Sequence, residues 1–190
     1  MSRIISGLAG SLRLSAAAKE TRPTSDRVKE SLFSTLENQG AIENARVLDL
    51  FAGSGALGLE ALSRGASSLV MVEKSKSAFA ICKKNSDLVT NALAKQSIEV
   101  SVELRNKDAA HYINALEHEF DLVFVDPPYE FSETKLQEIL GLLVEKLSAN
   151  GVLVLERSAK SSKPDIAGLE RYLDKTYGDT QVSLFRRFSQ

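Results

Sequence analysis

Four consecutive residues, Asp126-Pro127-Pro128-Tyr129, form the pattern in this chain that says most about chemistry. They follow residues 120–125, an apolar run typical of a buried strand. Proline fixes φ and has no backbone N–H, so both proline carbonyls are predicted to stay free to accept a hydrogen bond from a substrate amino group. The Asp126 carboxylate can accept a second hydrogen bond, and the Tyr129 ring offers a face for a planar base. The tetrapeptide therefore predicts a catalytic site that methylates a flat amino group; an ordinary strand with a proline turn is the alternative.

A glycine-rich turn lies upstream, between an apolar strand at 46–50 and a helix at 57–63. Glycine permits positive φ and close approach of a ligand to the backbone. A helix N-terminus also presents free N–H groups to a carboxylate or phosphate. The turn is therefore predicted to bind a cofactor. The residues predicted to do so are Asp49, Phe51, Ala52, Gly53, Ser54, Gly55 and Gly58.

The spacing Gly-x-Gly-x-x-Gly also occurs in dinucleotide sites, so the acidic residues nearby decide which cofactor is predicted. Asp49, just before the turn, would face the pyrophosphate of NAD unfavourably, whereas it suits the ammonium group of a methionine moiety. Glu73 closes the strand at 68–73 and is placed to bind a ribose diol, which both cofactors contain. Asp108, followed by Ala109, is a candidate acceptor for the adenine amino group and also a candidate N-cap. Asp49 and the tetrapeptide together favour S-adenosylmethionine.

The composition is that of about one globular domain: 190 residues, 43% hydrophobic and 26% charged. The opening residues are too mixed for a signal peptide and no run of about 18 apolar residues occurs, so a cytoplasmic protein is expected. Cys82 falls on the apolar face of a predicted helix, which indicates a buried structural thiol. His111 and His118 are isolated in the sequence, so no metal site is predicted.

The charge is nearly balanced but unevenly distributed. A formal net charge of −1 excludes a basic field over the whole protein. Residues 1–30, in contrast, hold six Lys or Arg against three Asp or Glu, and such a local excess can contact phosphates. The N-terminal hairpin and arm at 1–24 is therefore a candidate RNA-contacting region, and a solvated terminal segment is the alternative. It is followed by a methyltransferase domain at 25–190, within what is effectively a single domain.

Beyond residue 40 the apolar patterns alternate between strands and helices. Strands are predicted at 46–50, 68–73, 98–104, 121–125 and 151–155, and helices at 57–63, 76–91, 108–117 and 132–147. Two further runs, 169–177 and 181–188, flank the turn signal Gly178-Asp179 and predict a terminal hairpin. The residues before 40 predict a short hairpin at 3–14 and a helix that ends near Asn38.

Strands separated by helices imply an α/β fold with right-handed crossovers. The prediction is a Rossmann-like class I S-adenosylmethionine-dependent methyltransferase fold. It has a mostly parallel, doubly wound sheet with an antiparallel C-terminal strand, plus a small N-terminal β-hairpin. Ligands of such sheets bind beyond the carboxyl ends of the strands, near the point where the strand order reverses. The predicted acidic residues all sit at or just past those ends.

The segments Thr21–Val28, Leu48–Gly55 and Asp126–Tyr129, with the opening Arg3–Gly7, resemble bacterial 16S rRNA guanine-N2 methyltransferases, the RsmD family. The resemblance covers almost the whole chain. It implies methyl transfer from S-adenosylmethionine to the exocyclic N2 of guanine 966 in 16S rRNA, within an assembled or assembling small ribosomal subunit. The substrate-binding residues on this interpretation are Arg22, Thr24, Arg27 and Tyr129. Members usually carry a denser Arg/Lys cluster in the first hairpin than this chain has at 10–14.

Three other functions are weighed against this one. A DNA adenine-N6 methyltransferase uses the same tetrapeptide, more often with Asn first, and needs a target-recognition domain that 190 residues barely accommodate. A protein-glutamine methyltransferase also prefers Asn there and usually has an extra substrate domain. A non-enzymatic RNA-binding module would need neither Asp126 nor Glu73.

Overall fold

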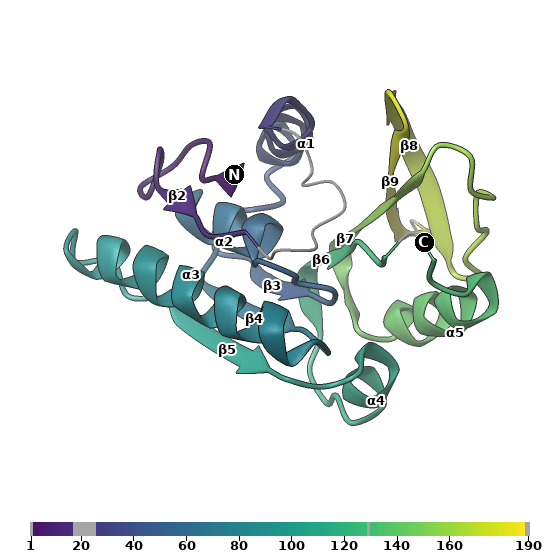
Figure 1. The fold of residues 1–190 in the computed structure, drawn as a ribbon. Helices are drawn as coiled ribbons and strands as arrows, with labels where there is room; N and C mark the ends of the chain where they lie inside the picture. Colours follow the sequence, from purple (N-terminus) through teal and green to yellow (C-terminus); the bar gives the residue numbers. More distant parts are fainter. Residues whose placement is uncertain (1, 17–25, 129, 189–190) are drawn as a thin grey trace.

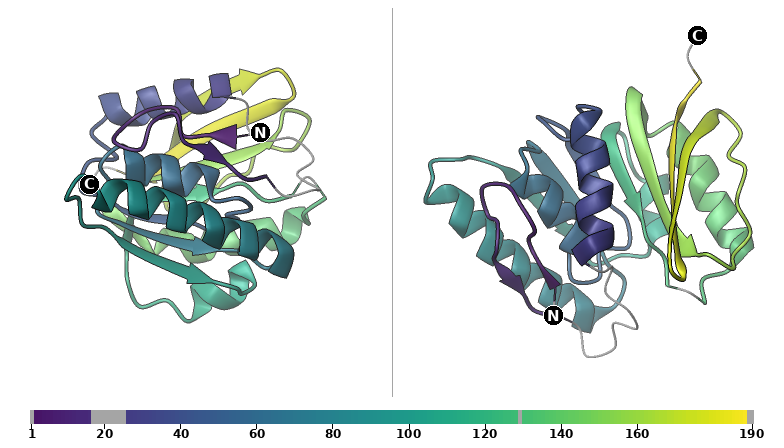
Figure 2. Two further views of the ribbon diagram at one scale, coloured as in Figure 1. Left: turned by 60° about the vertical axis from the view of Figure 1, so that its left-hand side comes forward. Right: turned by 90° about the horizontal axis from the view of Figure 1, so that it is seen from above.

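The computed structural model describes residues 2–16, 26–128 and 130–188 (Figure 1). Within these ranges one seven-stranded mixed sheet is covered by helices on both faces (Figures 1 and 2). The α/β fold class predicted from the alternation of strands and helices is confirmed. In the described part of the chain, no helix is long and apolar enough to cross a membrane.

The sheet reverses its strand order at the position where the two sequence motifs meet. Its strands are β3 (Arg46–Asp49), β4 (Ser68–Val72), β5 (Ser101–Arg105), β6 (Phe120–Val125), β7 (Leu147–Ser158), β8 (Leu169–Tyr177) and β9 (Thr180–Arg187). Their spatial order is β5-β4-β3-β6-β7-β9-β8, so β3 and β6 are neighbours although two strands separate them in sequence. The strand β9 runs antiparallel to both β7 and β8, which confirms the predicted antiparallel strand.

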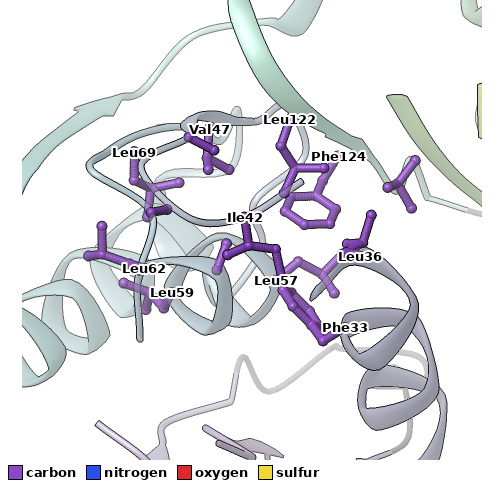
Figure 3. Close-up of a cluster of buried hydrophobic side chains, with 14 of the residues drawn as sticks. Phe33, Leu36, Ile42, Val47, Leu57, Leu59, Leu62, Leu69, Leu122 and Phe124 are labelled. Carbon is purple, nitrogen blue, oxygen red and sulfur yellow. The ribbon is translucent and has the colours of Figure 1, made fainter. Parts of the chain in front are cut away.

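Two hydrophobic cores lie on opposite faces of the sheet because successive strand residues alternate between the faces. The helices α1 (Asp26–Asn38), α2 (Ala56–Ser63) and α3 (Lys76–Ala94) cover the face that contains Val47. Figure 3 shows part of that core, including Phe33 against Phe124 at a ring-centroid distance of 5.7 Å. The helices α4 (Ala109–Asn114) and α5 (Glu133–Val144) cover the opposite face.

Several predicted boundaries differ from the structure. The strand β5 begins at Ser101 rather than at 98, because the chain first closes α3: the Ile98 amide donates to the Leu93 carbonyl at 3.1 Å. Helix α4 ends at Asn114 rather than at 117. The helix predicted at 132–147 ends at Val144, and β7 begins at Leu147 rather than at 151. Leu147 is buried and pairs with Phe120 before an irregularity shifts the register, so burial there favours a strand.

The predicted N-terminal hairpin is present and packs on α2. The strand β1 (Ser2–Arg3) pairs antiparallel with β2 (Arg13–Leu14), with Arg3 opposite Arg13. The turn between them approaches the C-terminal end of α2 closely, since a Cβ on Gly7 would lie 2.0 Å from the Ser63 carbonyl oxygen. Gly7 also has φ of 82°, so only glycine fits this contact.

A buried ionic network fixes the same hairpin to α2. The carboxylate of Glu60 is fully buried and accepts hydrogen bonds from the amides of Ile5 (2.7 Å) and Ser6 (3.1 Å). The Arg64 guanidinium donates to the Glu60 carboxylate at 2.7 Å, and the fully buried Lys29 ammonium lies 3.9 Å from the same carboxylate. Burial lowers the pKa of Lys29, while the charge of Glu60 acts in the opposite direction. The N-terminal hairpin is therefore attached to α2, the helix that follows the glycine-rich turn.

Candidate active site

Parallel pairing brings four acidic residues to one edge of the sheet. Asp49 ends β3 beside Phe124 of β6 and Met71 of β4. Glu73 follows β4 directly, and its amide donates to the carbonyl at the end of β5 at 3.0 Å. Asp108 caps α4 after β5, and Asp126 follows the last residue of β6. The order β5-β4-β3-β6 therefore sets the acidic residues predicted from the sequence side by side.

The glycine-rich turn is compact, and a side chain at Gly55 would be in tight contact with its neighbours. Gly53 and Gly55 both have positive φ, 53° and 81°. The Gly55 amide donates to the Ala52 carbonyl at 2.6 Å, and the Ala52 amide donates to the Val72 carbonyl at 2.9 Å. A Cβ on Gly55 would lie 3.2 Å from Cys82 Sγ, and that thiol is buried as predicted. The turn is thus packed against β4 and α3.

Asp49 is a buried carboxylate that orients the first turn of α2. Its Oδ2 accepts the Gly58 amide at 3.0 Å, and only 1% of the residue is exposed. Burial raises the pKa of Asp49 to about 7, the Gly58 hydrogen bond lowers it, and the negative charge of Glu73 raises it further. Among the described residues, no cationic side chain contributes to this pKa. The carboxylate therefore sits where an incoming positive charge would stabilise its ionised form.

Gly58 is needed for packing. A Cβ at this position would lie 2.6 Å from Leu69 Cδ1 and 3.2 Å from Asp49 Oδ2. Its predicted place among the cofactor-binding residues rests on the motif, whereas its amide in the structure is engaged by Asp49.

The substitution Gly58→Ala is expected to lower the free energy of unfolding by roughly 1–3 kcal/mol, because the added methyl group overpacks the contact between α2 and β4. Chemical denaturation measures it. Gly141→Ala on α5 is the matched control, since a Cβ there meets nothing within 4 Å and a helix favours alanine. Equal unfolding free energies in the two variants would contradict the packing role of Gly58.

Glu73 joins the two loops that border the predicted cofactor site. Its Oε2 accepts the Gly53 amide at 2.9 Å and its Oε1 accepts the Ser75 amide at 2.6 Å. Asn106 donates to the Glu73 carbonyl at 2.7 Å, which holds the same turn from the β5 side. Each carboxylate oxygen has a second lone pair, so Glu73 can accept from a ligand diol while these bonds persist.

Asp108 is the N-cap of α4, as its alternative role predicted. Its Oδ1 accepts the amide of Ala110 at 3.1 Å, and its Oδ2 accepts the Lys74 ammonium at 3.1 Å. The Lys74 hydrogen bond is the main cause that lowers the pKa of Asp108. The carboxylate is half-exposed at the carboxyl edge of the sheet, so capping leaves it accessible to solvent and to a ligand. The neighbouring Ala109 is buried.

The segment after β6 positions two of the three described tetrapeptide residues at the same edge. Asp126 is half-buried and Pro127 is buried, while Pro128 is exposed. The Pro128 carbonyl accepts the Phe131 amide at 2.9 Å, so the prediction that both proline carbonyls stay free is wrong for Pro128. The reason is that the chain must turn here to begin α5. Asp126 and Pro127 are the residues of this segment that are predicted to accept a substrate amino group.

An aromatic contact that the sequence did not predict joins the glycine-rich turn to the segment after the tetrapeptide. Phe51 of the glycine-rich turn and Phe131 lie edge to face, with ring centroids 5.2 Å apart. Phe51 is predicted to contact the cofactor, and its ring also holds the segment after β6. No sequence signal pairs these two phenylalanines, because the contact depends on the neighbouring placement of β3 and β6.

Three of the predicted substrate-binding residues, Arg22, Thr24 and Tyr129, lie outside the described residues. The fourth, Arg27, is exposed in the first turn of α1. In the described ranges, no group of three or more His, Cys, Asp or Glu side chains is arranged to hold a metal ion.

Comparison with known proteins identifies the family. Residues 2–186 match the family described as Conserved hypothetical protein 95. Ribosomal RNA small subunit methyltransferase D of Haemophilus influenzae is 36% identical over 191 residues, covering 97% of this chain and 93% of that protein. The enzyme of the same name from Escherichia coli K12 is 32% identical over 172 residues, covering 89% and 81%.

Solved structures agree with the fold. A hypothetical protein of Thermus thermophilus superposes with a TM-score of 0.81 at 27% identity, covering 98% of this chain and 99% of that one. Magnesium protoporphyrin IX methyltransferase from Synechocystis, solved with bound S-adenosylmethionine, has a TM-score of 0.65 at 13% identity and shares the fold. The resemblance deduced from the sequence motifs is confirmed, and the chain belongs to the family of ribosomal RNA small subunit methyltransferase D.

Proposed function

We propose that this protein is an S-adenosylmethionine-dependent rRNA methyltransferase that modifies the exocyclic N2 of a guanine in the small-subunit RNA. The observation that carries the proposal is the adjacency of β3 and β6, which places the glycine-rich turn beside Asp126 and Pro127 at the reversal of strand order. The names of the relatives support rRNA as the substrate. The choice of guanine N2 and of position 966 rests on the family resemblance. The predicted acceptors after β6 by themselves suit any planar amine.

The residues at the carboxyl edge fit the proposed cofactor. Asp49 is buried without a cationic partner among the described residues, so the ammonium of the methionine moiety would supply the missing charge. Glu73 and Asp108 offer acceptors for the ribose diol and the adenine amino group. The remaining members of the predicted set lie in three places: Phe51, Ala52, Gly53, Ser54 and Gly55 in the glycine-rich turn, Gly58 in α2 and Ala109 at the start of α4. Bound there, the cofactor supplies a methyl group on a positively charged sulfur.

The protein's part in the reaction is to hold the amine and localise its lone pair. The lone pair of an exocyclic aromatic amine is delocalised into the ring, which makes the nitrogen a poor nucleophile. Hydrogen bonds from the –NH2 group to the Asp126 carboxylate and the Pro127 carbonyl would favour a pyramidal nitrogen. The Asp126 carboxylate would also stabilise the positive charge on the nitrogen before its proton is lost. Orientation alone can supply roughly 7–11 kcal/mol of rate acceleration.

The N-terminal segment at 1–24 and the exposed Arg27 form the proposed RNA-contacting part, and 25–190 the methyltransferase domain. A net charge of −1 and one local basic region predict weak binding to free RNA, because affinity follows the number of phosphates neutralised. Selectivity would then come from a folded target that presents an unstacked guanine. Extruding a stacked base costs a few kcal/mol, and stacking on Tyr129 would return ~1–3 kcal/mol. We therefore expect an assembled or partly assembled small subunit to be a better substrate than naked rRNA.

Cofactor binding is expected to depend on pH through Asp49. The pKa of about 7 in the free protein means that Asp49 is mostly protonated at pH 6 and mostly ionised at pH 8. A bound ammonium favours the ionised form and lowers this pKa. Affinity for S-adenosylhomocysteine should therefore rise about tenfold from pH 6 to pH 8, since each pH unit below the pKa costs a factor of ten.

Isothermal titration at the two pH values, in buffers of different ionisation enthalpy, measures both the affinity and the proton released. Asp49→Asn keeps an oxygen acceptor for the Gly58 amide but cannot ionise, so its affinity should be low and independent of pH. A wild-type affinity that falls between pH 6 and pH 8 would contradict the placement of the ammonium at Asp49.

The proposed function is tested by transfer of a tritiated methyl group to small ribosomal subunits, naked rRNA and duplex DNA in parallel. Mass spectrometry identifies the modified nucleoside, and primer extension across 16S rRNA from a deletion strain locates it. N2-methylguanosine in rRNA is the expected product. N6-methyladenine in DNA would overturn the proposal in favour of a DNA methyltransferase, and labelled protein without labelled nucleic acid would favour a protein methyltransferase.

A further inference from the structure

Asn85, on α3, connects the glycine-rich turn to the N-terminal hairpin through one side chain. Its Nδ2 donates to the Ser54 carbonyl at 2.8 Å and to the Ser15 carbonyl at 2.9 Å. Its Oδ1 accepts the Ser15 amide at 2.8 Å. Only 1% of the residue is exposed. Both amide hydrogens and the amide oxygen are therefore committed, in a place where water does not replace a lost partner.

The two segments that Asn85 joins belong to different parts of the proposed site. Ser54 lies in the glycine-rich turn between two glycines of positive φ, so its carbonyl orientation is part of the turn geometry. Ser15 follows β2 at the end of the hairpin. Asn85 therefore pairs with both the amide and the carbonyl of Ser15, as a neighbouring strand would, and so links the hairpin end to the turn.

The hairpin presents cations on its outward side. Arg3 and Arg13 are opposite each other across β1 and β2, and both are exposed, while Ser2 and Leu14 point inward. Arg3 is paired with Asp26 at 2.9 Å, but that pair is exposed and contributes little to stability. The hairpin therefore offers a guanidinium pair to an external anion while its inner side is fixed to α2 and α3.

We propose that Asn85 is a positioning residue that couples occupation of the cofactor site to the placement of the RNA-contacting hairpin. This inference rests on the proposed function. A ligand that orders the Ser54 turn would orient its carbonyl, strengthen the Asn85 hydrogen bonds and hold Ser15. By reciprocity, RNA held by the hairpin would raise the affinity for the cofactor by the same factor as the cofactor raises the affinity for RNA. We expect that factor to be about five to twenty, within the range usual for coupled sites.

The first experiment needs no RNA. Hydrogen–deuterium exchange is followed in peptides covering residues 8–16, with and without saturating S-adenosylhomocysteine, in wild type, Asn85→Ala, Asn85→Asp and Asn91→Ala. The cofactor product is expected to slow exchange at Ser15 at least fivefold in wild type and in Asn91→Ala, an exposed asparagine on the same helix. Both Asn85 variants are expected to lose this response. Unchanged exchange in wild type, or a retained response in the Asn85 variants, overturns the proposal.

Folding of the variants is checked by circular dichroism and thermal melting. Asn85→Asp is included because it is isosteric and keeps the acceptor for the Ser15 amide while it removes both donors. The contacts of Glu60 with the hairpin are untouched in these variants, so the hairpin is expected to remain attached to α2.

The second experiment measures the coupling itself. The dissociation constant for small ribosomal subunits is determined with and without S-adenosylhomocysteine for the same four proteins. The ratio is expected to be five or more for wild type and Asn91→Ala, and about one for the Asn85 variants. A ratio that stays at five or more in the Asn85 variants refutes the coupling. If the protein does not bind RNA at all, this assay fails for every protein, whereas the exchange experiment still reports on Asn85.

Discussion

Asp126→Ala is expected to lower the turnover number for methyl transfer by roughly 10²–10⁴-fold, the range typical of losing a side chain that acts on a proton of the reacting group. The dissociation constant for S-adenosylhomocysteine should stay within a few-fold of wild type. The separation follows from the strand order, because Asp126 follows β6 while the predicted cofactor-binding residues follow β3, β4 and β5. Single-turnover methylation of small subunits and isothermal titration measure the two quantities independently.

Two further variants sharpen this test. Asp126→Asn keeps an oxygen acceptor for the substrate amine but lacks the charge, so residual activity above that of Asp126→Ala isolates the hydrogen bond. Asp121→Ala is the matched control, since it removes a carboxylate from the same strand. It also removes the acceptor of the Arg46 amide and guanidinium, so thermal melting checks that this variant is folded. Near-native turnover by Asp126→Ala would refute the mechanism in which the carboxylate grips the amine.

The carboxyl-edge acidic residues could be predicted from the sequence because their positions depend on local patterns. Apolar runs define the strands, and the residue that ends each run must lie at the carboxyl edge of a parallel sheet. Asp49, Glu73 and Asp126 were found in this way, and the register places them as neighbours. The cap at Asp108 follows equally from local chemistry, since aspartate before a helix accepts its free amides.

The features that sequence reasoning missed depend on contacts between distant segments. The start of β7 at Leu147 reflects burial against Phe120, which no pattern in the helix before it indicates. The Pro128 carbonyl accepts the Phe131 amide because the chain turns between these residues. The chemistry of proline alone does not indicate which later amide will donate to its carbonyl. Asn85 lies 70 residues from Ser15 in sequence and 31 from Ser54, so a polar residue within a predicted helix carried no sign of either contact.

The specific substrate was suggested by resemblance and not by physical reasoning. The predicted acceptors Asp126 and Pro127 suit any planar amine. The sequence motif therefore does not distinguish methylation of guanine from methylation of adenine or of a glutamine side chain. In the structure, the hairpin that carries the exposed Arg3 and Arg13 is hydrogen-bonded through Asn85 to the glycine-rich turn. A substrate rich in phosphates agrees with that arrangement better than a protein side chain does.

Glu73→Ala is expected to weaken the binding of S-adenosylhomocysteine by about 10–150-fold, because a hydrogen bond to a charged group contributes roughly 1.5–3 kcal/mol. The structure gives Glu73 two tasks, since it also accepts the amides of Gly53 and Ser75. Loss of affinity alone would therefore not show whether the diol or the loop geometry was affected. Glu99→Ala, which removes an exposed glutamate from the segment before β5, is expected to bind like wild type.

The 2′-deoxy analogue of S-adenosylhomocysteine separates the two tasks of Glu73. If the carboxylate binds the diol, wild type should prefer the ribose form over the deoxy form by about tenfold or more, and Glu73→Ala should bind both equally weakly. If Glu73 only holds the loops together, the variant should keep the wild-type preference at lower overall affinity, and the assignment of the diol to Glu73 would be wrong. NAD serves as the third ligand in the same titrations. Tighter binding of NAD than of S-adenosylhomocysteine by wild type would contradict the cofactor assignment, because the buried Asp49 carboxylate would then lie beside a pyrophosphate.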